Sequence, residues 1–166
     1  MLVLGIDPGT ATTGYGLVTE EPDSSLRAID FGVILTPANS PMPERLLTLF
    51  QRLNEIILLH QPDCGAVEKL FFQRNVTTAI TVGEARGIAL LSFALAKKPV
   101  TEYTPLEVKQ SICGYGRAEK GQVQRMVQAL LGLPELPQPD DIADALAIAI
   151  CHLSSSAFMD KIEASQ

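Results

Sequence analysis

Hydrophobic positions along the chain follow two patterns: short continuous runs, and longer stretches in which they recur every three or four residues. Short apolar runs that end at turn residues are typical of buried strands, and the longer periodic stretches are typical of amphipathic helices. The runs predict strands at residues 1–6, 14–19, 26–35, 64–67 and 99–103. The periodic stretches predict helices at residues 44–60, 76–96, 105–112, 121–132 and 140–155.

Three strands in succession, followed by strands that alternate with helices, predict an α/β protein with one five-stranded mixed sheet and helices on both faces. The 166 residues suit a single domain, which we place at residues 1–153. Residues 154–166 are polar, and we expect them to form a frayed C-terminal tail.

The composition excludes several classes of protein. Hydrophobic residues make up 46% of the chain and charged residues 19%, which excludes a disordered chain. No apolar run reaches the roughly 18 residues of a membrane span, and the N-terminus lacks the basic region of a signal peptide. The three cysteines are widely spaced and fit neither a disulfide framework nor a zinc site. We therefore expect a cytoplasmic protein with no membrane partner.

Charge is distributed unevenly along the chain. The formal net charge is −6, which by itself argues against a nucleic-acid partner. Residues 66–125, however, contain nine Lys and Arg against five Glu, and the remaining residues contain four against fourteen acids. A basic middle with acidic flanks permits a surface that binds a polyanion, although solvated charge is the commoner explanation.

Carboxylates stand at unusual places in this pattern. Asp7 and Glu68 each follow a predicted buried strand, while Asp141 and Asp144 share one face of the predicted last helix. Taken singly, Asp7 is a turn residue, Glu68 a surface acid and Asp140 a helix N-cap. Four acids brought to one place would instead repel each other strongly. Two hard divalent cations would compensate them and would support phosphodiester hydrolysis.

Five segments together resemble the RuvC-type Holliday junction resolvases, and the resemblance extends over residues 1–153. They are Gly5–Thr10 (GIDPGT), Thr13–Gly16 (TGYG), Ala66–Glu68 (AVE), Ala85–Gly87 (ARG) and Asp141–Ala147 (DIADALA). The resemblance implies an RNase H-like fold and a homodimer that resolves four-way DNA junctions by paired symmetric nicks in recombination and repair. One departure is the acidic net charge, since members of the family that bind DNA avidly tend to be basic.

The resemblance also implies the chemistry of the site. The family's catalytic acids, which are its metal ligands, correspond to Asp7, Glu68, Asp141 and Asp144. The implied cofactor is Mg²⁺, two ions per subunit, with Mn²⁺ as a substitute. A branch-migration motor complex of the RuvA/RuvB type is a candidate partner.

Six residues of the basic middle are candidate DNA contacts: Phe71, Phe72, Arg74, Lys109, Arg117 and Lys120. An exposed ring of the adjacent phenylalanines would stack on an unpaired base, whereas two buried rings would only pack under the next helix. The resemblance favours stacking chiefly for Phe71, and it implies phosphate contacts for Lys109 and Lys120. Arg117 is included for its charge and its place beside a glycine-rich loop, where a solvated loop is the alternative.

The predicted helix at residues 76–96 has the small residues Ala79, Gly83 and Gly87 at four-residue intervals on one face. Glycine within a helix costs about 1 kcal/mol relative to alanine, so two on one face indicate that another backbone approaches closely. That backbone is either this chain's own sheet or, as the resemblance implies, the same helix of a second subunit.

Two other functions fit part of the pattern. A turn of the form GIDxGT after the first strand also opens actin-like phosphotransferases, but those proteins have two lobes and this chain has no second copy of the motif. A non-catalytic junction-binding module of the same fold would be expected to lack one or more of the four acids, and all four are present. The predicted function is therefore a Mg²⁺-dependent endonuclease that resolves four-way junctions.

Overall fold

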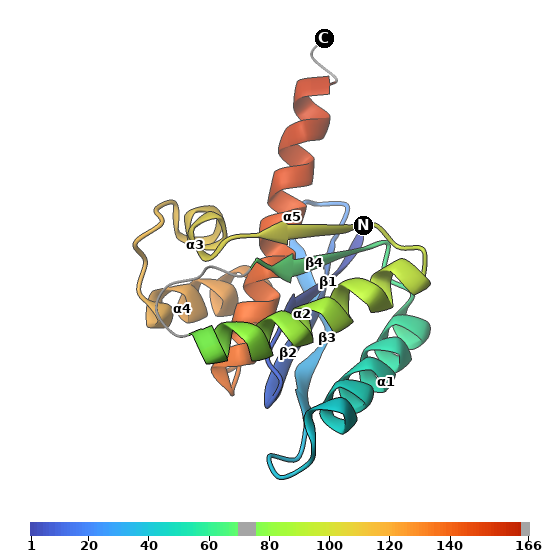
Figure 1. The fold of residues 1–166 in the computed structure, drawn as a ribbon. Coiled ribbons are helices and arrows are strands. Elements are labelled where there is room, and N and C mark those ends of the chain that lie inside the picture. The colour runs from blue at the N-terminus through green and yellow to red at the C-terminus, as the bar shows by residue number, and fades with distance from the viewer. Residues whose placement is uncertain (70–75, 164–166) are drawn as a thin grey trace.

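The computed structural model describes residues 1–69 and 76–163, and within them a sheet of five strands lies between two groups of helices (Figure 1). The strands are β1 (Leu2–Asp7), β2 (Thr12–Glu20), β3 (Leu26–Leu35), β4 (Cys64–Glu68) and β5 (Val100–Tyr103). The helices are α1 (Met42–His60), α2 (Val76–Leu95), α3 (Pro105–Cys113), α4 (Lys120–Leu131) and α5 (Asp140–Glu163). Apart from the end of α5, every predicted element lies within two residues of its observed bounds.

The strand order is β3-β2-β1-β4-β5. β1, β2 and β3 pair antiparallel, whereas β1 with β4 and β4 with β5 pair parallel. The prediction of a five-stranded mixed sheet is therefore confirmed. Because β1 and β4 run in the same direction, their C-terminal ends meet at one edge of the sheet.

Helices cover both faces of the sheet, as predicted. α3, α4 and α5 pack on the face that contains Val3 and Ala66, and α1 and α2 pack on the face that contains Leu4 and Val67. Successive side chains of a strand point to opposite faces. Asp7 therefore points to the same side as Val3, and Glu68 to the same side as Ala66, which is the side of α5.

Helix α5 lies unusually close to β1 and β2 because glycines face it. A β-carbon added at Gly5 would clash with the carbonyl oxygen of Ala145 and lie 2.8 Å from the backbone nitrogen of Ala149. One added at Gly14 would clash with the carbonyl oxygen of Asp141 and lie 2.6 Å from its carbonyl carbon. These two glycines let the backbone of the helix rest directly on the sheet.

The predicted end of the last helix near residue 155 is wrong, since α5 continues to Glu163 through most of the segment expected to be frayed. Figure 1 shows its C-terminal half extending beyond the sheet. Ser155 and Ser156 donate hydrogen bonds to the carbonyl oxygens of Cys151 and His152, so their hydroxyls are satisfied within the helix. The change to polar residues after residue 153 therefore coincides with the point where the helix leaves the core, and not with its end. The residues that follow include no Gly or Pro that would end a helix.

In residues 1–69 and 76–163, none of the helices combines the length and the hydropathy of a membrane-spanning segment.

Candidate active site

Two acids meet at the C-terminal ends of β1 and β4. The parallel pairing places Ile6 opposite Val67, so the residues that follow, Asp7 and Glu68, end neighbouring strands side by side. Both point toward α5, as the alternation of each strand requires. Asp7 ends β1 opposite Gly14 of β2.

The other two acids come from the start of α5. Asp140 is the first residue of the helix, and Asp141 and Asp144 occupy its first two turns. The backbone of Asp141 packs directly against Gly14 of β2, which is the residue that pairs with Asp7. This contact holds the start of α5 close to Asp7. Three elements that are distant in sequence thus bring the four predicted acids to one edge of the sheet.

Burial and mutual repulsion raise the pKa values of the carboxyl groups of Asp7, Glu68 and Asp144. Burial, followed by the charges of Glu68, Asp144 and Asp141, raises the pKa of Asp7 to about 8. Burial and the charge of Asp144 likewise raise the pKa of Glu68, and burial raises the pKa of Asp144 although Lys120 opposes it. The cluster is therefore costly to ionise and needs positive charge nearby.

Two lysines supply part of that charge. The Nζ atom of Lys120 lies 2.6 Å from Oδ2 of Asp140 and 2.9 Å from Oδ2 of Asp144. Burial lowers the pKa of Lys120, but the hydrogen bonds to these two carboxylates outweigh it and raise that pKa above its usual range. The charge of Lys109, on α3, lowers the pKa of Glu68.

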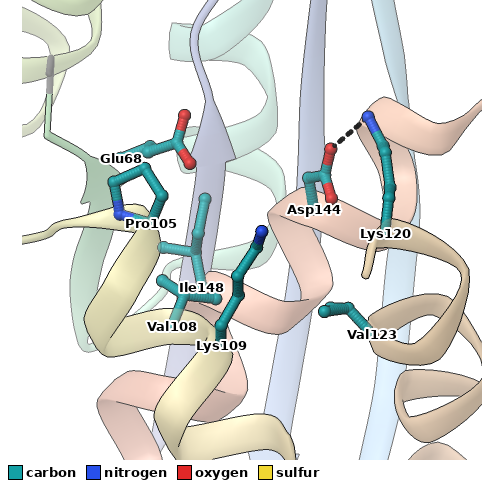
Figure 2. A pocket seen from close by; sticks show the side chains of 8 residues that line it. All are labelled: Glu68, Pro105, Val108, Lys109, Lys120, Val123, Asp144 and Ile148. Carbon is teal, nitrogen blue, oxygen red and sulfur yellow. Dashed lines mark ion pairs between the residues drawn. The ribbon is translucent and has the colours of Figure 1, made fainter. Parts of the chain in front are cut away.

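A pocket of about 160 Å³ opens beside the acids (Figure 2). Its lining residues are Glu68, Pro105, Val108, Lys109, Lys120, Val123, Asp144 and Ile148. In Figure 2, Lys109 extends from α3 toward the space between Glu68 and Asp144, and a dashed line joins Asp144 to Lys120. The pocket therefore combines four charged side chains with an apolar wall formed by Pro105, Val108, Val123 and Ile148.

The donor set fits a hard divalent cation, since carboxylate oxygens are the ligands that Mg²⁺ prefers. The four acids also repel each other where they stand, which a bound cation would relieve. Among the described residues, no three Asp, Glu, His or Cys side chains are grouped closely enough to hold one ion in their present rotamers. A cation bound by three of these acids would require their side chains to rotate, and one bound by Asp144 would replace Lys120 there.

The remaining predicted site residues divide into three groups. Lys109 and Lys120 line the pocket, whereas Arg117 is exposed and does not line it. The predicted contacts Phe71, Phe72 and Arg74 lie outside the described residues.

The small residues of α2 lie at its surface. Ala79 and Gly83 are half-buried and Gly87 is exposed. A β-carbon added at Gly87 would meet no atom of this chain within 4 Å. The chain's own sheet therefore does not explain glycine at this position.

Two features of the site were not predicted from the sequence. The apolar wall was not anticipated, although Ile148 follows Asp144 by one helical turn and so shares its face. Thr13 was not singled out either. It is almost fully buried, and its hydroxyl donates to the carbonyl of Gly9 (2.6 Å) and accepts from the Gly9 N–H (3.3 Å), which closes the turn after Asp7.

Known proteins are similar to this chain over almost its whole length. Residues 3–152 match the family described as crossover junction endodeoxyribonuclease RuvC. A protein of that name from Desulfitobacterium hafniense (strain DSM 10664 / DCB-2) is 57% identical over 162 residues, 98% of each chain. Another, from Chloroflexus aurantiacus (strain ATCC 29366 / DSM 635 / J-10-fl), is 59% identical over 152 residues, 92% of each chain.

Two solved structures have similar folds. Thermus thermophilus RuvC in complex with a Holliday junction substrate superposes with a TM-score of 0.90 at 38% identity, covering 95% of this chain and 96% of that one. The yeast mitochondrial Holliday junction resolvase Ydc2 superposes with a TM-score of 0.71 at 16% identity, covering 93% of this chain and 80% of that one. At that identity the second match bears on the fold alone.

Proposed function

Because this chain belongs to the RuvC family of crossover junction endodeoxyribonucleases, with their RNase H-like fold, we propose that Asp7, Glu68, Asp141 and Asp144 are its catalytic metal ligands. Family membership makes the protein a metal-dependent nuclease that resolves Holliday junctions in DNA recombination and repair. We assign it two Mg²⁺ ions per subunit, with Mn²⁺ able to substitute. The observation that carries the proposal is the half-buried carboxyl of Asp7, which has three further acids from β4 and α5 near it.

The residues around the acids have distinct tasks in this proposal. When bound, the metal ions activate the attacking water and stabilise the leaving oxygen of the phosphodiester. Lys120 would be released from Asp144 when a cation is bound there, and with Lys109 it would then bind phosphate at the mouth of the pocket. The apolar wall around Ile148 limits water, which strengthens these electrostatic contacts.

Further DNA contacts are proposed outside the pocket. Arg117 is assigned to a phosphate of an arm, Arg74 to the strand near the cut, and Phe71 with Phe72 to stacking on an unpaired base at the branch point. These assignments rest on the sequence and on the family.

A cleavage assay tests the proposed function. A labelled four-way junction should be nicked symmetrically in the presence of Mg²⁺ and remain intact in EDTA, and a linear duplex of the same sequence should be cut much more slowly. ATP hydrolysis measured in parallel should be absent. Binding without Mg²⁺-dependent nicking would favour the non-catalytic module, and ATP turnover would favour the phosphotransferase.

We also propose that α2 forms the two-fold contact of a homodimer, which would place two active sites on one junction. Alongside exposed Gly87, the same face of α2 exposes Ile80 (59%), Leu91 (48%) and Leu95 (59%). Apolar side chains on either side of a glycine suit a second helix that approaches closely at that glycine. A branch-migration complex of the RuvA/RuvB type stays a prediction from the family.

Replacing Gly87 with Leu is expected to convert the dimer to monomers. The added side chain meets open space in its own chain, so the variant should fold normally, yet it would hold the two helices apart. Light scattering at micromolar concentration should give about half the mass of the unchanged protein. Ala129→Leu, at an exposed position of α4, is the matched control and should remain dimeric. A monomeric unchanged protein would contradict the proposed contact.

A further inference from the structure

A chain of side-chain hydrogen bonds runs from α1 to the turn that follows Asp7. Arg45 donates from Nε to Oγ1 of Thr36 at 2.8 Å, and the Thr36 hydroxyl donates to the carbonyl oxygen of Thr10. The backbone N–H of Thr36 also donates to the carbonyl of Ala11 at 3.1 Å. Thr10 is three residues after Asp7, so these contacts hold the turn that begins at the acid.

Arg45 differs from the other arginines that make side-chain hydrogen bonds in residues 1–69 and 76–163. Arg27, Arg52 and Arg86 each pair with a glutamate, whereas Arg45 donates only to a neutral hydroxyl. Its two Nη groups have no hydrogen-bond partner in that part of the chain. In a protein with 19 acidic and 13 basic residues, a half-buried guanidinium without a counter-charge is unexpected.

The position of Arg45 suits DNA. Because β1 and β3 each pair antiparallel with β2, they run in the same direction and end at the same edge of the sheet. Figure 1 shows α1 beginning at that edge, shortly after the end of β3. Arg45 lies in the first turn of α1, and its bond to Thr36 connects it to the turn after Asp7. The pocket is lined by residues of α3, α4 and α5, which pack on one face of the sheet, whereas α1 packs on the other face.

We propose that Arg45 binds a backbone phosphate of a junction arm through its Nη groups and positions, through Thr36, the turn that follows Asp7. The planar guanidinium fork matches phosphate oxygens and leaves Nε free for Thr36. A phosphate that fixes the guanidinium also fixes Thr36, and Thr36 fixes the carbonyl of Thr10. This inference rests on the proposed function, since the ligand is the DNA that the site cleaves.

The phosphate contact is tested by the salt dependence of binding. Arg45→Gln should weaken junction binding in EDTA by roughly tenfold and reduce the log–log salt slope by about one. Arg52→Gln is the matched control, because Arg52 lies two helical turns further along the same face of α1 and is already paired with Glu55. It should keep the slope of the unchanged protein. An unchanged slope in Arg45→Gln would overturn the phosphate contact.

The positioning role is tested by chemistry at saturating junction. Thr36→Val keeps the branched shape but can neither donate to Thr10 nor accept from Arg45. It should slow single-turnover nicking roughly tenfold while leaving the salt slope and the KM unchanged, and Thr36→Ser should restore the rate. Nicking at the normal rate by Thr36→Val, or no rescue by Ser, would overturn the positioning role.

These results are distinguishable from a failure of the proposed function. If neither the unchanged protein nor Arg52→Gln nicks a junction with Mg²⁺, the proposed function fails, and the salt slope still reports whether Arg45 meets a phosphate. Melting temperatures of all four variants, measured in the same buffer, identify any that is not folded.

Discussion

An Asp7→Asn variant is expected to bind a four-way junction as well as the unchanged protein does, but to nick it roughly a thousandfold more slowly. Asn keeps the size of the side chain and removes the charge that would hold the metal ions. Binding should survive because the proposed phosphate contacts come from Lys109 and Lys120, and because the loss of a negative charge eases repulsion from DNA. The variant therefore separates binding from chemistry.

The same substitution is expected to raise the melting temperature of the metal-free protein. Burial and the neighbouring carboxylates raise the pKa of Asp7 from 3.8 to about 8. Between about pH 4 and pH 8 the folded protein therefore keeps a proton that the unfolded chain has released, so stability falls as the pH rises. Asn carries no such group, so the gain in melting temperature should grow from near zero at about pH 4 to its largest value near pH 8.

Three measurements on one preparation test both expectations: gel-shift affinity, the nicking rate at saturating Mg²⁺, and the melting temperature in EDTA at several pH values. Glu135→Gln removes the same charge from an exposed position before α5 and should change none of them. Near-normal nicking by Asp7→Asn would contradict its role as a metal ligand. A lower melting temperature in EDTA would mean that protein hydrogen bonds hold Asp7 as a structural turn residue.

The strands and the positions of the four acids could be predicted because both depend on the local sequence pattern. Apolar runs that stop at a turn residue identified β1 and β4, and a carboxylate at the end of each run stood out against them. When two parallel strands are neighbours, their C-terminal ends lie at the same edge of the sheet. The proximity of Asp7 and Glu68 therefore follows from the topology. Asp141 and Asp144 could be placed on one helical face from their spacing alone.

Pairings between distant elements could not be predicted in the same way. Asp140 was interpreted as an N-cap, yet its carboxylate pairs with Lys120 because α4 packs beside the start of α5. The bonds from Arg45 to Thr36 and from Thr36 to Thr10 depend on how the loop before α1 folds back on the first turn. No periodicity in the sequence encodes such contacts, since each partner is ordinary in its own segment.

Glycines in the sequence indicated close approaches, but only the structure shows which segment approaches each one. The pattern of α2 left open whether Gly87 faces the sheet or another subunit, and the open space around it excludes the sheet. Gly5 and Gly14 were quoted only as parts of motifs, yet each removes a side chain from the path of α5. A glycine in a buried strand indicates that something approaches closely, but not what approaches.

Replacing Gly14 with Ala is accordingly expected to lower both the melting temperature and the nicking rate. The new methyl group would clash with the carbonyl oxygen of Asp141 and lie 2.6 Å from its carbonyl carbon. Both atoms belong to helix backbone, so the clash is relieved only if the first turn of α5 moves away from β2. Overpacking of this kind costs about 1–3 kcal/mol, or roughly 2–12 °C for a protein of this size.

The nicking rate should fall further than the loss of stability explains. Asp141 and Asp144 would move with the helix while Asp7 stays on β1, and a misplacement of about 1 Å can cost roughly a hundredfold in rate. Nicking is measured well below the melting temperature, with folding checked by circular dichroism. Gly121→Ala is the matched control, because its methyl group would meet only Nη1 of Arg125 at 3.5 Å, and its melting temperature should not fall. Gly14→Ala could also melt and nick like the unchanged protein. In that case α5 can lie farther from the sheet without loss, and the close contact at Gly14 does not set the geometry of the acids.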